Sequence, residues 1–214
     1  MSTGARHRMV DEQLRARGVA DERVLAAMRS IPRERFVPAN LAHRAYADEA
    51  LPVDVGQSIS QPWIVAHMTE LLAIQRGDRV LELGTGTGYQ SAILASMGAR
   101  VLSIERHKAL ADQARTRLRS LALDHLVEVR IGDGSLGASS GDGPFDGIIV
   151  TAAAPAIPDQ LREQLRDGGR LVIPVGTRDR QVLTRSVRHG DEWIETAHGA
   201  CVFVPLIGPG GFPD

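Results

Sequence analysis

The feature that most constrains the fold is the glycine-rich segment R-V-L-E-L-G-T-G-T-G-Y-Q, residues 79–90. It starts with the apolar residues of a short buried strand and continues from Tyr89 into a segment of helical character. Between them, Gly84, Gly86 and Gly88 form a turn with almost no side chains, which lets a ligand approach the backbone. The first N–H groups of a helix have no partner inside the helix. The segment therefore predicts a strand–turn–helix unit with a ligand beside the turn.

The spacing of these glycines separates two classes of cofactor. Dinucleotide-binding units carry G-x-G-x-x-G, with the third glycine one place later than in this chain. Tyr89 occupies that later position, and the acidic Glu82 precedes the first glycine. The pattern resembles motif I of the S-adenosylmethionine-dependent methyltransferases. Taken alone, the motif leaves open a tight turn without a ligand.

From residue 78 the chain alternates predicted strands and helices, with short connections. Strands are predicted at 79–83, 100–104, 126–131, 145–150 and 170–175, and helices at 89–97, 110–121 and 158–166, the last ended by Gly168-Gly169. Such alternation requires a parallel sheet with helices on its faces. Residues 181–188 and 193–206 flank His189-Gly190-Asp191 and predict an antiparallel hairpin. We expect an α/β fold with a doubly wound, mostly parallel sheet of about seven strands.

The first third of the chain predicts a helical extension. Residues 9–30 predict two short helices, of which the second is capped by Asp21 and ended by Ile31-Pro32. Residues 32–55 predict irregular structure. We expect one domain, made of an N-terminal extension with an active-site loop, a cofactor-binding core and a C-terminal part of antiparallel strands and tail, at residues 1–77, 78–176 and 177–214.

A serine-containing loop enters the next predicted helix. Pro62 suits the first turn of a helix over residues 62–72. Ser58 and Ser60 therefore lie in the loop before it, with hydroxyl groups available to a ligand. The alternative is that Ser60 caps the helix, a role that serine fills well.

Two acidic residues end neighbouring predicted strands, where ligands bind in open α/β sheets. Glu105 stands 17 residues after Gly88, and a carboxylate there can accept both hydroxyl hydrogens of a ribose. Asp133 ends the third strand between two glycines and is placed to accept from an adenine amino group. The alternative for Glu105 is an exposed acid paired with Arg106 or Lys108, which the context disfavours. The alternative for Asp133, taken alone, is an ordinary Asp-Gly turn. Together with the glycine turn, they predict an adenosine pocket.

The end of the fourth predicted strand bears on the reaction. It has the sequence V-T-A-A-A-P, residues 150–155, without the acid or amide followed by Pro-Pro-aromatic that an exocyclic amine of a nucleobase would require. No cluster of acids suggests a magnesium-assisted site. These absences indicate an acceptor that is already nucleophilic.

Charge and composition limit the partners and the compartment. The net charge is −1, so no overall field favours nucleic acid or a membrane surface. Cys201 is the single cysteine, which fits a reducing compartment. The seven histidines are scattered, and we expect no metal site. Without a signal peptide or a membrane span, we expect a cytoplasmic protein that binds neither nucleic acid nor membrane, with a monomer favoured.

The motifs together resemble one family, the protein-L-isoaspartate O-methyltransferases, from about Val10 to Leu206. The segments that carry the resemblance are G-Q-S-I-S-Q-P-W (56–63), V-L-E-L-G-T-G-T-G-Y-Q (80–90), I-G-D-G (131–134), F-D-G-I-I-V-T-A-A (145–153) and F-V-P-L (203–206). The resemblance implies the Rossmann-like methyltransferase fold and S-adenosylmethionine as cofactor. It also implies methyl transfer to the free α-carboxylate of L-isoaspartyl residues in damaged proteins and peptides, which initiates their repair.

The same resemblance implies roles for particular residues. Ser60 corresponds to the active-site serine of the family, with the substrate beside Ser58 and Ile59. The substrate groove is implied along Val204, Pro205 and Leu206. The cofactor pocket is implied at Glu82, Gly84, Gly86, Gly88, Glu105, Gly132 and Asp133, with Glu105 on the ribose and Asp133 on the adenine.

Three departures and three alternatives accompany this interpretation. Ser58 stands where threonine is usual, Asp54-Val55 where a glycine-containing pair is usual, and Ile207 where some members have threonine. The nearest alternative is another small-molecule O-methyltransferase on the same sheet, which a panel of carboxylate acceptors would distinguish. A nicotinamide-dependent oxidoreductase is disfavoured by Tyr89. A binding module without catalysis is disfavoured by the intact I-S-Q-P segment.

Overall fold

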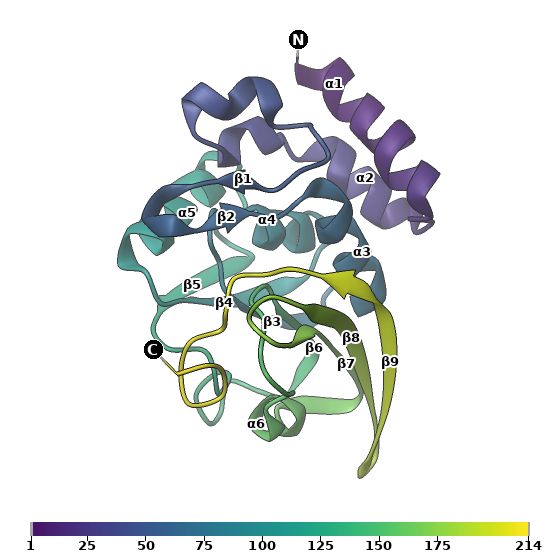
Figure 1. The fold of residues 1–214 in the computed structure, drawn as a ribbon, viewed down its shortest axis with the longest axis vertical. Coiled ribbons are helices and arrows are strands. Elements are labelled where there is room, and N and C mark those ends of the chain that lie inside the picture. The colour runs from purple at the N-terminus through teal and green to yellow at the C-terminus, as the bar shows by residue number, and fades with distance from the viewer. Residues whose placement is uncertain (1, 214) are drawn as a thin grey trace.

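Seven strands form one sheet in the computed structural model, which describes residues 2–213 (Figure 1). The order is β5-β4-β3-β6-β7-β8-β9, parallel from β5 to β7 and antiparallel from β7 to β9. The strands are β3 (Arg79–Leu83), β4 (Arg100–Glu105), β5 (Val127–Ile131), β6 (Phe145–Val150), β7 (Leu165–Gly176), β8 (Gln181–His189) and β9 (Glu192–Cys201). The predicted doubly wound, mostly parallel sheet with a C-terminal hairpin is confirmed.

Residues of the central strands β3, β4, β6 and β7 enter two hydrophobic cores, one on each face of the sheet. In β3, Val80 packs into one core and Leu81 and Leu83 into the other. The first core is covered by the N-terminal helices and by α3 (Pro62–Leu72), α4 (Tyr89–Ser96) and α5 (Lys108–Ser120). The second is covered by α6 (Asp159–Glu163) and by the chain around Leu206. Both faces of the sheet are therefore buried at its central strands, whereas β9 is largely exposed.

Two predictions near the C-terminus are wrong in their boundaries. The helix predicted at 158–166 is only the short α6, and Gly168-Gly169 lie inside β7 instead of ending a helix. Leu165 already pairs with Phe145 of β6, and the pairing resumes at Gly147 with Arg170 after a register shift. Gly168 and Gly169 therefore lie in the irregular stretch of β7 between these two pairs. The predicted strand 193–206 also stops early, at Cys201, because Leu206 donates its N–H to Ala153 O at 2.7 Å, beyond the end of β6.

The N-terminal extension begins earlier than predicted. Helix α1 (Ser2–Arg8) continues through the π-helical turn Met9–Leu14 and the 3₁₀ turn Arg15–Arg17, where the sequence predicts a start near residue 9. The residues of α1 are mostly polar and carry no apolar stripe, so periodicity could not reveal them. Helix α2 (Glu22–Ser30) confirms both predicted signals: Asp21 accepts the N–H of Arg23 at 2.9 Å, and Ile31 is extended.

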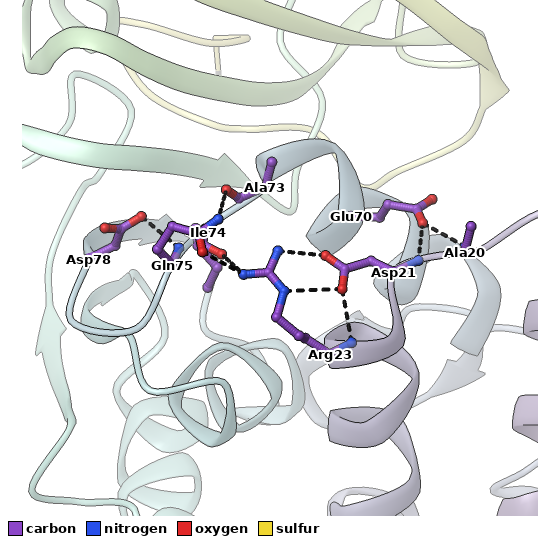
Figure 2. Close-up of polar contacts among 8 residues, drawn as sticks. All are labelled: Ala20, Asp21, Arg23, Glu70, Ala73, Ile74, Gln75 and Asp78. Atoms are coloured by element: carbon purple, nitrogen blue, oxygen red, sulfur yellow. Dashed lines mark hydrogen bonds and ion pairs between the residues drawn. The ribbon is translucent and has the colours of Figure 1, made fainter.

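Figure 2 shows how this extension is attached to the core. The Glu70 carboxylate of α3 accepts the backbone N–H groups of Ala20 and Asp21, both at 2.7 Å. Arg23 pairs with Asp21 at 2.7 Å and donates to the carbonyl of Ile74 at 3.0 Å, in the turn before β3. The contacts fix the start of α2 against α3 and against the turn that leads into β3.

Between α2 and α3 the chain is irregular, as predicted, with short local elements. These are the 3₁₀ turns Arg33–Phe36, Ala39–Arg44 and Asp54–Gly56 and the two-stranded antiparallel sheet of β1 (Leu51–Pro52) and β2 (Ser58–Ile59). Leu51 pairs with Ile59, and both side chains are buried, so this small sheet anchors the loop that carries Ser58 and Ser60. No helix within residues 2–213 is long and apolar enough to cross a membrane.

Candidate active site

The glycine turn after β3 is fixed by a contact from the end of β6. Gly84 has φ of +91°, and a Cβ atom there would lie 2.5 Å from the Thr151 hydroxyl oxygen. That hydroxyl donates to the Gly84 carbonyl at 2.6 Å. Only glycine fits this position, for both reasons. The sequence predicts the turn, but the partner Thr151 is 67 residues away and appears only in the structure.

A cavity of about 260 Å³ opens beside this turn, at the carboxyl ends of β3, β4, β5 and β6. It brings together most of the residues that the sequence predicts for cofactor and substrate. Those lining it are Ser58, Ile59, Ser60, Gly84, Gly86, Glu105, Gly132, Asp133, Val204, Pro205 and Leu206.

Two predicted cofactor residues do not line the cavity. Glu82 is completely buried behind the turn, where Ser91 and Ser103 both donate to its carboxyl group. Burial raises the pKa of Glu82 to about 7, although the two serine hydroxyls act in the opposite direction. Gly88 instead packs on α5, where a Cβ atom would lie 3.2 Å from that of Ala114. Both residues support the turn from behind, without facing the cavity.

Glu105 lies at the cavity wall with its carboxylate held in place. It is 5% exposed, and it accepts the N–H of Gly86 at 2.8 Å and that of His107 at 2.9 Å. The alternative of an exposed acid is therefore wrong, and Lys108 pairs with Asp112 instead. A carboxylate has about four acceptor positions, so two remain for ribose hydroxyls. The residues at this wall fit the adenosine part of S-adenosylmethionine.

Asp133 combines the predicted turn with a place at the cavity. Its Oδ1 accepts the N–H of Ser135 at 2.8 Å, as an Asp turn does. The C-terminal tail packs directly on it, since a Cβ atom on Gly208 would lie 2.5 Å from Asp133 Oδ2. The tail is held further by Gly210, whose N–H donates to the Ser135 hydroxyl at 3.2 Å. The sequence offers no signal for this contact beyond the glycines themselves.

Ser60 is not a helix cap. Helix α3 starts at Pro62 as predicted, but its N-cap is Gln61, and no side chain caps it. Ser60 lines the cavity and is half-buried, and within residues 2–213 its hydroxyl has no hydrogen-bond partner. Its hydroxyl is thus available for a ligand.

The segment after β9 closes the cavity from the other side. Val204 accepts the N–H of Ala153 at 2.8 Å, and Pro205 bridges to Ala153. This places Val204, Pro205 and Leu206 in the same cavity as Ser60, and Ile207 follows them in its wall.

Several residues of the cavity wall were not among the predicted site residues. They include Gln57, Thr85, Thr87, Tyr89, Gln90, His107, Thr151 and Ile207. Tyr89 is the most informative, because its buried ring joins the cavity to the N-terminal extension. The Phe36 ring packs edge-on against it, with 5.3 Å between the ring centres, and the Arg33 guanidinium carbon lies 4.9 Å from the centre of the Tyr89 ring. In the sequence, its position directly after the third glycine is the feature that could have indicated a place at the cavity.

The sheet order, with a cavity that fits adenosine at the carboxyl ends of its strands and the Ser60 hydroxyl in the same cavity, is that of a Rossmann-like, S-adenosylmethionine-dependent methyltransferase. The sequence profile of one family, described as Protein-L-isoaspartate(D-aspartate) O-methyltransferase, matches residues 5–210. The chain belongs to this family.

Individual relatives agree with the family. The chain is 52% identical over 208 residues to a protein-L-isoaspartate O-methyltransferase of Methylorubrum populi, covering 97% of both chains. It is 54% identical over 195 residues to the one from Yersinia pestis, covering 91% of this chain and 92% of that protein.

Two solved structures share the fold. A protein-L-isoaspartate O-methyltransferase superimposes with a TM-score of 0.81 at 26% identity, covering 95% of this chain and 66% of that longer chain. A protein-L-isoaspartate O-methyltransferase structure from Plasmodium falciparum, in complex with S-adenosyl-L-homocysteine, also superimposes with a TM-score of 0.81. The identity is 22%, and the match covers 94% of this chain and 98% of that chain.

Proposed function

We propose that this chain transfers a methyl group from S-adenosylmethionine to the free α-carboxylate of L-isoaspartyl residues in proteins and peptides, which begins their repair. The observation that carries the proposal is the Ser60 hydroxyl, which has no hydrogen-bond partner among residues 2–213, in the same cavity as the fixed carboxylate of Glu105. One cavity thus offers an adenosine site and an acceptor site.

The cofactor side of the cavity binds and orients. Glu105 accepts the ribose hydroxyls with the oxygen positions that Gly86 and His107 leave free. Asp133 accepts from the adenine amino group, and the turn at Gly84 and Gly86 lets the ligand lie close to the backbone. When bound, S-adenosylmethionine supplies an electrophilic methyl group.

The acceptor needs orientation more than activation. A free α-carboxylate is ionised at pH 7, so no protein base has to remove a proton. The Ser60 hydroxyl donates to one carboxylate oxygen and directs the other toward the place where bound S-adenosylmethionine would present its methyl group. Transfer of the methyl from sulfur to that oxygen would give the methyl ester and S-adenosylhomocysteine. Ser60 is no covalent nucleophile, because it lacks a G-x-S-x-G turn. The catalytic contribution is positioning and exclusion of water, which the buried Ile59 and Leu206 assist.

The position of the carboxylate relative to the peptide sets the specificity. In isoaspartate the carboxylate lies one carbon from the backbone nitrogen, and in aspartate two. If Val204 to Leu206 hold the flanking peptide, the aspartate carboxylate is displaced from the methyl group. A misplacement on the order of 1 Å can reduce the rate about a hundredfold.

The test is tritiated methyl transfer to two peptides that differ only in isoaspartate or aspartate at one residue. We expect labelling of the isoaspartyl peptide, near-absence of labelling of the other, and release of tritiated methanol in base, which identifies an ester. Equal labelling of both, or a product stable in base, would contradict the proposed function.

We further propose that the protein acts in the cytoplasm, as a monomer, on proteins and not on nucleic acid. The lone Cys201 supports a reducing compartment, and burial raises its thiol pKa to about 11, which keeps the reactive thiolate scarce. Sedimentation at several concentrations tests the monomer, and a shift toward dimer with concentration would contradict it.

A further inference from the structure

A second cavity lies at the amino ends of the strands. Its volume is about 510 Å³, and none of the residues described as lining it also lines the candidate active site. Arg79 and Arg100, in its wall, are the first residues of β3 and β4. Since a strand rises about 3.3 Å per residue, β3 separates the two cavities by on the order of 15 Å.

Basic side chains dominate the wall of this second cavity. Arg79 and Arg100 are register partners in the parallel pairing of β3 with β4. Side chains at paired positions project from the same face, where like charges repel. Arg115 and Arg119 of α5, together with His125, add to the same wall.

The counter-charges within the wall are fewer and are already engaged. Its acids are Asp124, which lies 3.7 Å from Arg119 Nε, and Glu128, which pairs with Arg130 at 2.6 Å. Arg115 pairs with Asp112, outside the wall, at 2.9 Å. Within residues 2–213, this leaves a formal excess of two positive charges in the wall, on Arg79, whose guanidinium donates to the Asp142 carbonyl, and on Arg100. The excess is local, because the whole chain has a net charge of −1.

Arg100 is the free donor of the cluster. Within residues 2–213 its guanidinium has no hydrogen bond or ion pair, although its backbone N–H is fixed on Asp78 O at 2.8 Å. Arg115, in contrast, is held by the Val129 carbonyl at 2.6 Å from Nη2. The cavity thus has a rigid basic wall and an unengaged guanidinium beside it.

The floor of the cavity is apolar. It contains Leu102, Leu118, Val129 and Phe145, and the Arg79 guanidinium lies 5.6 Å from the Phe145 ring centre. Guanidinium groups suit oxyanions, which accept two parallel hydrogen bonds from them. We propose that this cavity binds a small phosphate monoester, with its phosphate on Arg79 and Arg100 and its apolar body on the floor.

The proposal is tested by calorimetric titration of the full chain with phenyl phosphate and with inorganic phosphate at one ionic strength. We expect one site that binds phenyl phosphate more tightly than phosphate, and R100Q should weaken it about tenfold, as loss of a charged hydrogen bond does. R180Q is the matched control, because Arg180 is exposed and lies in the turn between β7 and β8. It should bind like the unaltered protein.

Three results would overturn the proposal. They are absence of saturable binding, equal loss in R100Q and R180Q, and displacement of phenyl phosphate by S-adenosylhomocysteine, which would assign the ligand to the other cavity. R119Q, on α5, repeats the test should R100Q fail to fold, with the same weakening expected and unaltered binding counting against the site.

Discussion

The two halves of the candidate active site are built in different ways. The cofactor half consists of strand ends, where Glu105 is 5% exposed and fixed by two backbone N–H groups. The acceptor half consists of segments outside the main sheet, attached through the short β1–β2 pair and an isolated bridge at Pro205. Ser60 in that half has no hydrogen-bond partner within residues 2–213.

This difference teaches which substitutions separate binding from stability. A residue of the cofactor half holds the backbone as well as the ligand, so its loss should affect both. A residue of the acceptor half, such as Ser60, has only the ligand to hold. Substitutions in the two halves should therefore differ in how strongly they change affinity and stability.

Glu105→Ala should have the largest effect. Two hydrogen bonds to ribose are lost, each contributing roughly 1.5–3 kcal/mol, so affinity for S-adenosylhomocysteine should fall at least about a hundredfold. The N–H groups of Gly86 and His107 also lose their acceptor, so the free energy of unfolding should fall by about 2 kcal/mol. Calorimetry and urea unfolding measure the two. Unchanged affinity in a folded variant would remove Glu105 from the pocket.

Gly208→Ala tests the tail against Asp133. The added Cβ atom would meet the Asp133 carboxylate at 2.5 Å and displace it, so cofactor affinity should fall about tenfold. Gly199→Ala is the control, because Gly199 also has a positive φ, of +97°, but nothing lies within 4 Å of the added atom. S-inosylhomocysteine lacks the amino group that Asp133 is proposed to bind, so its affinity should change little. Equal losses for both nucleosides would argue against an adenine contact.

Glu82→Gln tests whether the buried carboxyl destabilises the turn when it ionises. The Glu82 pKa is about 7 in the folded chain and 4.5 ordinarily, so the folded state keeps a proton that the unfolded state releases between these values. Stability is therefore lost as pH rises from 4.5 through 7. The difference corresponds to at most about 3 kcal/mol.

Glutamine cannot ionise, so the free energy of unfolding of Glu82→Gln should not fall with pH for this reason. The difference in free energy of unfolding between Glu82→Gln and the unaltered protein should therefore shift in favour of the variant by about 1 kcal/mol or more between pH 5 and pH 8. Urea unfolding at both pH values measures this. A gap of the same size at pH 5 and pH 8 would show that Glu82 does not titrate in this range.

Prediction from sequence works where a signal is local. The alternation around Val80 and Leu81, the proline at position 62 and the acids at strand ends each indicate structure within a few residues. Gly168-Gly169 mislead, because glycines end helices and also accommodate irregular strands. Two contacts join segments that are distant in the sequence, and no periodicity encodes them. They are the contact between Thr151 and Gly84 and the contact between Gly208 and Asp133. For Ser60, only the three-dimensional contacts separate a cap from a ligand-binding hydroxyl.

The division between the two halves is tested most directly by the affinity of Ser60→Ala for S-adenosylhomocysteine. Methyl transfer should fall about tenfold through loss of a hydrogen bond to a charged group, and Ser60→Thr, which keeps a hydroxyl, should recover part of it. We expect Ser60→Ala to bind S-adenosylhomocysteine within about twofold of the unaltered protein and to have the same free energy of unfolding. A tenfold loss of that affinity, or the loss of about 1 kcal/mol of stability that a helix cap would give, would contradict it.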